Sequence, residues 1–123
     1  MIVERLDTSG IYREFPNLNI EIRKGFLDKT LPGFPDRPIA FLHIDVDLYA
    51  GYRDALTYLF PKVRPGGIIA FDEYREFPKT PEYGNGMIEK WPGCTKSVDD
   101  YFADSGQEAR YYPETKKYYI VKG

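Results

Sequence analysis

Four carboxylates follow two apolar segments of the chain, and they are the residues with the clearest potential for chemistry. Asp45 and Asp47 come at the end of one apolar run, and Asp72 and Glu73 come at the end of a second. An ionised carboxylate that is buried without a partner costs several kcal/mol, so these groups need water, backbone amides, a cation or a metal ion. An oxygen-only ligand set favours a hard cation, Mg²⁺ or alternatively Ca²⁺ or Mn²⁺.

The segments that precede these acids predict two neighbouring strands. The runs 39–44 and 67–71 are continuously apolar, which is typical of parallel strands covered on both faces. A helix is expected between them, and such a strand–helix–strand unit is right-handed. The carboxyl ends of parallel strands meet at one edge of a sheet, so we expect the four carboxylates to converge there. The helix is predicted from apolar residues at helical spacing, namely Tyr52, Ala55, Leu56, Leu59 and Phe60.

Each of these polar residues also has a structural interpretation. Asp47 could be the N-cap of the helix that begins near Leu48 or Tyr49. His43, the single histidine, lies inside an apolar run and is interpreted as a hydrogen-bonded core or interface residue. Cys94 is expected to be an inert thiol, because no base is adjacent.

The remaining elements complete an α/β fold. We predict one domain over 1–123, an open and mostly parallel sheet that ends in an antiparallel hairpin. The elements expected are a short helix within 1–17, a strand at 19–24, a turn-rich linker without regular structure at 28–38, a long loop or lid at 74–93, a helix around 98–102 and hairpin strands at 109–112 and 118–121.

Composition limits the classes of protein to consider. The 123 residues are 42% hydrophobic and 29% charged, with a formal net charge of −2, as in soluble globular domains. The sequence has no block of basic residues that would indicate nucleic-acid binding, and no apolar run approaches the roughly 20 residues that span a membrane. The one cysteine excludes an intrachain disulfide and favours the cytoplasm.

Several separated motifs resemble the macrocin O-methyltransferase (TylF-type) family. They are "KGFLDKTLP", "IAFLHIDVDLYAGYRDAL", "FPKVRPGGIIAFDEY" and "KYYIVK", in the family's order. The resemblance implies a class I, S-adenosylmethionine-dependent methyltransferase with a Rossmann-like sheet that methylates sugar hydroxyls of natural products. It implies Asp45, Asp72 and Glu73 as Mg²⁺ ligands, with Asp45 also as the general base. Tyr49 and Tyr74 are our candidate substrate-binding residues.

The chain departs from the family pattern at the cofactor site. No G-x-G-x-x-G occurs in the sequence, so the cofactor-binding residues are unknown. The resemblance therefore covers the C-terminal half of such an enzyme, without its first two strands, and Met1 is interpreted as an internal methionine of a truncated frame. The strand at 39–44 would then be an exposed edge, which we expect either 19–24 or a second copy to cover, giving a homo-oligomer.

Two other functions compete with methyl transfer. One is a non-catalytic, oligomerising α/β domain in which the acids only cap helices. The other is a D-x-D metal-dependent phosphotransfer or glycosyltransfer enzyme. A haloacid-dehalogenase-type phosphatase, however, has a hydroxyl residue after its second aspartate, where this chain has Leu48 and Tyr49.

Overall fold

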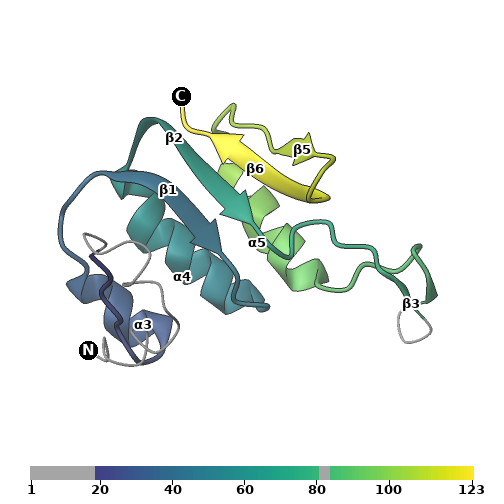
Figure 1. The fold of residues 1–123 in the computed structure, drawn as a ribbon, viewed down its shortest axis with the longest axis horizontal. Coiled ribbons are helices and arrows are strands. Elements are labelled where there is room, and N and C mark those ends of the chain that lie inside the picture. The colour runs from purple at the N-terminus through teal and green to yellow at the C-terminus, as the bar shows by residue number, and fades with distance from the viewer. Residues whose placement is uncertain (1–18, 81–83) are drawn as a thin grey trace.

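A four-stranded mixed sheet forms the centre of the protein (Figure 1). The structure is a computed structural model that describes residues 19–80 and 84–123. The strand order is β1-β2-β6-β5, in which β1 and β2 are parallel and the other two pairings are antiparallel. The expected neighbouring strands and the terminal hairpin are confirmed. The strands are β1 (Ile39–Ile44), β2 (Val63–Phe71), β5 (Arg110–Tyr112) and β6 (Lys117–Val121).

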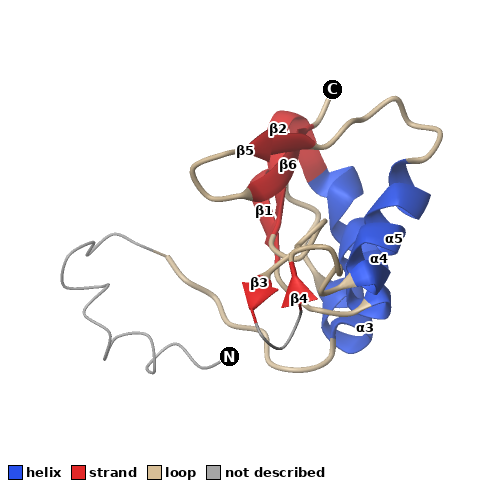
Figure 2. Cartoon of the chain, turned by 90° about the vertical axis from the view of Figure 1, so that its right-hand side faces the viewer, coloured by secondary structure: helices blue, strands red, loops and turns tan. Residues whose placement is uncertain are grey.

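The helices lie together on one side of this sheet (Figure 2). They are α3 (Leu27–Thr30), α4 (Tyr49–Leu59) and α5 (Pro92–Phe102), with 3₁₀ helices η1 (Leu31–Gly33) and η2 (Phe60–Lys62). Helix α4 leads from β1 back to β2, as predicted. No helix in the described ranges is long and apolar enough to cross a bilayer.

The hydrophobic core lies between the sheet and helices α4 and α5. Each parallel strand contributes alternate residues to it, and β6 contributes one more. Because side chains alternate along a strand, their neighbours point to the opposite face. The most completely buried core side chains are Ile44, Val63, Ile69, Phe71 and Ile120 from the strands and Tyr52, Leu56, Cys94 and Val98 from the helices.

The opposite face of the sheet has no described helix over it (Figure 2). Phe41 is 61% exposed and Ile68, its partner in the register, is 36% exposed. The side chain of His43 on the same face is 49% exposed. The apolar runs thus form strands as predicted, but only one of their two faces is covered within the described chain.

Three expectations for the connecting segments need correction. Residues 19–24 do not form a strand, since the alternation of apolar residues there finds no partner strand. Residues 28–38 are not free of regular structure: Pro32 is accommodated in the first turn of η1, where its missing N–H is not needed. The loop at 74–93 carries a small hairpin, β3 (Lys79–Thr80) and β4 (Gly84–Asn85). The helix predicted within 1–17 lies outside the described residues.

Gly67 is the position in β2 where a side chain is least tolerable. A Cβ atom there would lie 2.6 Å from Val63 Cγ1, 2.9 Å from Arg64 O and 3.1 Å from Ala40 O. Gly67→Ala should therefore lower the free energy of unfolding by about 1–3 kcal/mol, the usual cost of overpacking. Chemical denaturation measures this, with Gly33→Ala as the matched control, because a Cβ at Gly33 meets nothing within 4 Å. Equal stability of the two variants would contradict the packing described for β2.

Candidate functional site

The site is built on the turn that joins β1 to α4. The strand ends at Ile44, and the backbone then reverses with Asp47 in the left-handed region at φ 62°. The Leu48 N–H donates to Val46 O at 2.7 Å across this turn. Leu48, not Asp47, is the N-cap residue of α4, and no side chain caps that helix end. The interpretation of Asp47 as a helix cap is therefore wrong.

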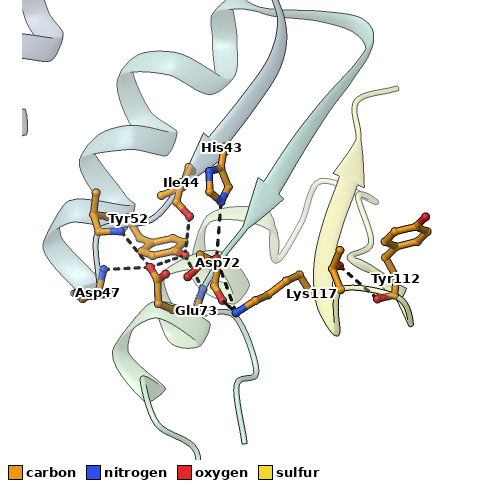
Figure 3. Close-up of polar contacts among 10 residues, drawn as sticks. His43, Ile44, Asp47, Tyr52, Asp72, Glu73, Tyr112 and Lys117 are labelled. Carbon is orange, nitrogen blue, oxygen red and sulfur yellow. Dashed lines mark hydrogen bonds and ion pairs between the residues drawn. The ribbon is translucent and has the colours of Figure 1, made fainter. Parts of the chain in front are cut away.

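Glu73 holds this turn in place from the end of β2 (Figure 3). Its Oε1 accepts hydrogen bonds from the backbone N–H groups of Val46 and Asp47, each at 3.0 Å. The Tyr52 hydroxyl of α4 lies 3.0 Å from the same oxygen and 3.1 Å from Ile44 O. Glu73 N–H in turn donates to that hydroxyl at 3.1 Å. One carboxylate oxygen thereby connects β1, α4 and β2.

The second oxygen of Glu73 has no such partner. Oε2 makes no hydrogen bond to any described residue. Because Glu73 is only 1% exposed, bulk water does not take the place of a partner. Burial, followed by the nearby carboxyl groups of Asp45 and Asp72, raises the pKa of Glu73 from 4.5 to about 7. A buried acceptor left without a donor is unfavourable by 1–3 kcal/mol as a rough figure. This oxygen is therefore a place where a cation or a proton would be stabilised.

Three carboxylates meet at this point. Asp45, Asp47 and Glu73 each offer one oxygen, and the three oxygens lie within 4.8 Å of one another. The two aspartates are exposed and the glutamate is buried, so the group opens to solvent on one side. The oxygen-only donors and the orphaned Glu73 Oε2 fit a hard divalent cation such as Mg²⁺.

Asp72, the other acid at the end of β2, lies beside this group and is not one of its three members. Its Oδ1 is 3.8 Å from His43 Nε2 and 3.7 Å from Lys117 Nζ. Lys117 Nζ also donates to Asp72 O at 2.8 Å. Asp72 thus lies between the acidic group and the cationic side chain of β6 (Figure 3). The sequence predicts Asp47 at this edge but not among the metal ligands that the family resemblance implies, although the D-x-D spacing already places it near Asp45.

The other candidate residues have structural neighbours of their own. The Tyr74 side chain is buried, and its hydroxyl donates to Asp99 Oδ1 at 2.6 Å. The Tyr49 hydroxyl lies 3.2 Å from Asp100 Oδ2, so both tyrosines contact α5. Their role in substrate binding stays a prediction. Cys94 is buried, and burial raises the pKa of its thiol to about 12, as expected of an inert cysteine.

The sheet, its helices and its acidic edge form part of a class I methyltransferase fold. The structure superposes on that of the O-methyltransferase NovP with a TM-score of 0.71, at 28% sequence identity. The match covers 98% of this chain and 44% of NovP. The structure of CalS11, a calicheamicin methyltransferase, gives a TM-score of 0.63 at 25% identity, over 81% of this chain and 36% of that one.

The sequence comparisons identify the family. The macrocin-O-methyltransferase (TylF) family profile matches residues 8–87, and the chain belongs to that family. The demethyldecarbamoylnovobiocin O-methyltransferase of Streptomyces niveus is 33% identical over 94 residues, which are 75% of this chain and 30% of that enzyme. A tetracenomycin-C 4'-O-methyltransferase of Streptomyces olivaceus, which acts on a rhamnosyl derivative, is 42% identical over 50 residues, 41% of this chain and 19% of that enzyme. The chain thus spans under a third of these curated relatives.

The raised pKa of Glu73 predicts how stability depends on pH in the metal-free protein. Between pH 4.5 and about 7 the folded state holds a proton that the unfolded state has lost, so stability falls as the pH rises through this range. Glu73→Gln keeps an acceptor for the Val46 and Asp47 amides and removes the titration. The stability of the variant relative to the parent should therefore rise from pH 5.5 to pH 8, by on the order of 1–2 kcal/mol.

Denaturant unfolding in a chelator at the two pH values measures this difference. Glu76→Gln is the matched control, because Glu76 is close in sequence but outside the acidic group. If the advantage of Glu73→Gln over the parent were the same at both pH values, Glu73 would not carry the extra proton.

Proposed function

We propose that this chain forms the metal and acceptor part of an S-adenosylmethionine-dependent O-methyltransferase that acts on a sugar hydroxyl of a natural product. Membership of the family and the names of its relatives support the reaction class. The observation that carries the proposal is the buried, unpartnered Glu73 Oε2 beside Asp45 and Asp47, at the carboxyl ends of two parallel strands. The cytoplasm is the proposed location.

The proposed ligands of Mg²⁺ are Asp45, Asp47 and Glu73, with Asp72 as a fourth, outer carboxylate. The closeness of the first three oxygens supports Asp47 over Asp72 as a direct ligand. A bound Mg²⁺ would polarise the acceptor hydroxyl and lower its pKa. Glu73 is fixed by three donors to Oε1, so its Oε2 is pre-oriented. Asp45 is exposed and is free to take the hydroxyl proton as general base.

The cofactor part of the enzyme is different. The glycine-rich turn that holds a dinucleotide-like cofactor in Rossmann-type folds has no counterpart in this sequence. We therefore assign no residue of this chain to S-adenosylmethionine. The acidic edge would orient and deprotonate the acceptor, and the methyl donor would have to lie in line with that hydroxyl.

Magnesium binding by Asp45 tests the metal part of the proposal. Isothermal titration of the chelator-treated protein with MgCl₂ should show saturable binding that Asp45→Asn weakens at least about tenfold, or about 1.4 kcal/mol. Asp36→Asn, an exposed aspartate in the segment before β1, is the control and should bind like the parent. Mg²⁺ should likewise raise the melting temperature of the parent and of the control, but not that of Asp45→Asn.

The reaction itself is tested with S-adenosylmethionine, MgCl₂ and a set of deoxysugar glycosides, with the methylated product read by mass spectrometry. Any product that the parent forms should be lost in Asp45→Asn. A protein that binds no Mg²⁺ and yields no methylated product would leave the non-catalytic α/β domain as its function. If the domain is non-catalytic and its acids only cap helices, Asp45→Ala should not stabilise the protein. If Asp45 belongs to a crowded metal-free site, the same substitution should stabilise it, because it removes one of the repelling carboxylates.

A further inference from the structure

Lys117 lies opposite Asp72, at the edge of the sheet that carries the acidic group. The register pairs Phe71 of β2 with Tyr118 of β6, which brings Asp72 and Lys117 to facing positions one residue further on. Lys117 Nζ donates to Asp72 O at 2.8 Å and lies 3.7 Å from Asp72 Oδ1. Figure 3 shows Asp72 between Lys117 and Glu73. The side chain of Asp72 can therefore face either a cation or the other carboxylates.

The hairpin fixes the backbone from which the Lys117 side chain extends. Strand β6 begins at Lys117, which pairs with Tyr112 of β5. The turn between these strands is closed by the Lys116 N–H, which donates to Tyr112 O at 2.9 Å. The ammonium group is thus held from two directions, by the paired backbone of its own strand and by the Asp72 carbonyl.

Asp72 is held less firmly than Glu73, the other acid at the end of β2. Glu73 is 1% exposed, and its Oε1 accepts two backbone N–H groups. The Asp72 side chain is 35% exposed, and its Oδ1 lies 3.7 Å from Lys117 Nζ and 3.8 Å from His43 Nε2, distances too long for hydrogen bonds. The backbone of Asp72 is fixed, since its N–H donates to Ile44 O at 3.0 Å. Rotation about its Cα–Cβ bond is therefore the movement open to this carboxylate.

Charge decides which way this rotation is favoured. Turned toward the acidic group, Asp72 would add a fourth negative charge to the three already there. Its carboxyl group is close enough to Glu73 to contribute to the raised pKa of that residue. Turned toward Lys117, the same carboxylate faces an ammonium group, and the attraction between them opposes rotation away. Lys117 therefore holds the fourth carboxylate outside the acidic group.

The number of carboxylates influences which divalent cation such a site prefers. Mg²⁺ keeps several of its water molecules, needs nearly ideal octahedral geometry and is usually bound through few carboxylates. Ca²⁺ accepts more oxygens at more varied angles, and its affinity depends on the total charge of its ligands. The acidic group opens to solvent at its two exposed aspartates, which suits a cation that retains water. A fourth carboxylate would replace water among the ligands and favour Ca²⁺.

We propose that Lys117 is a positioning residue that sets the cation preference of the acidic group. By holding Asp72 outside the group, it limits the carboxylate ligands to three and favours Mg²⁺ over Ca²⁺. It also leaves more of the cation's coordination sphere to water or to an acceptor hydroxyl. The inference rests on the proposed function for the presence of a cation, but it concerns a different residue and a different measurement. If the pair of Lys117 and Asp72 served stability alone, the cation preference would not depend on it.

Isothermal titration of the chelator-treated protein with MgCl₂ and, separately, with CaCl₂ tests the role of Lys117. Lys117→Met keeps the length of the side chain and removes its charge. The variant should bind Ca²⁺ about tenfold more tightly than the parent and Mg²⁺ at most about threefold more tightly, because Asp72 joins the ligands. Lys116→Met is the matched control, since Lys116 is exposed and its side chain makes no hydrogen bond or ion pair within the described ranges. It should change neither affinity by more than about twofold, because a distant exposed charge is screened.

Further variants show whether the effect passes through Asp72. Asp72→Asn in the Lys117→Met background removes the added carboxylate and should return the ratio of the two affinities to that of the parent. Asp72→Asn alone should leave this ratio unchanged, because Asp72 lies outside the acidic group in the parent. Lys117→Arg keeps the positive charge and should keep the parent's preference. Thermal melting in a chelator checks that each variant is folded, and Lys117→Gln replaces Lys117→Met if the latter is not.

The failure of this inference differs from the failure of the proposed function. If the parent binds Mg²⁺ and Lys117→Met has the same cation preference, the inference is wrong and the proposed function stands. Equal gains for both cations, a gain that survives Asp72→Asn, or the same gain in Lys116→Met would also overturn it. If the parent binds no Mg²⁺ but Lys117→Met binds Ca²⁺ in a manner that requires Asp72, the proposed function fails and the role of Lys117 stands. Binding of neither cation by any variant would overturn both.

Discussion

A single buried carboxylate holds together the end of the molecule where the candidate site lies. Glu73 Oε1 gathers the amides of the turn after β1 and the Tyr52 hydroxyl of α4, while its own backbone continues β2. Without this oxygen the two turn amides, which are partly buried, would have to bind water instead. The turn that carries Asp45 and Asp47 is therefore held by Glu73 as well as by the strand that precedes it. The rest of the site is arranged around this contact.

The same contact leaves the site with two unfavourable features. Glu73 Oε2 is buried without a donor, and Asp47 adopts a backbone conformation that non-glycine residues seldom adopt. Both occur at the junction of the parallel strands, where the paired backbone of β1 and β2 and the packing of α4 restrict relaxation. Such features are expected at functional sites more than in ordinary turns. A bound cation would compensate the buried Glu73 Oε2, and the positive φ of Asp47 brings its carboxylate into the same group.

The periodic part of the fold was readable from the sequence, and the turn geometry was not. Buried positions are occupied by apolar residues, so the buried strands and the buried face of α4 can be recognised from the spacing of apolar residues in the sequence. The strand expected at 19–24 had the alternation but found no partner, and pairing is a tertiary property. The convergence of Asp45 with Glu73 was foreseen from strand ends. The inclusion of Asp47 was foreseen as well, whereas the place of Asp72 outside the group was not, because it depends on the local geometry after β2.

The antiparallel hairpin gives the site a second kind of charge. The parallel pair carries its acids at the carboxyl ends of the strands, and β6, running the other way, begins at that same edge with Lys117. Its ammonium group lies near Asp72, which in turn neighbours Glu73, so acidic and basic regions meet at one aspartate. Reversing the direction of the last strand would place Lys117 at the far edge of the sheet. Because β6 runs antiparallel to β1 and β2, its first residue places a cation beside the carboxylates at the ends of those strands. A sheet of parallel strands alone would not bring these two strand ends to one edge.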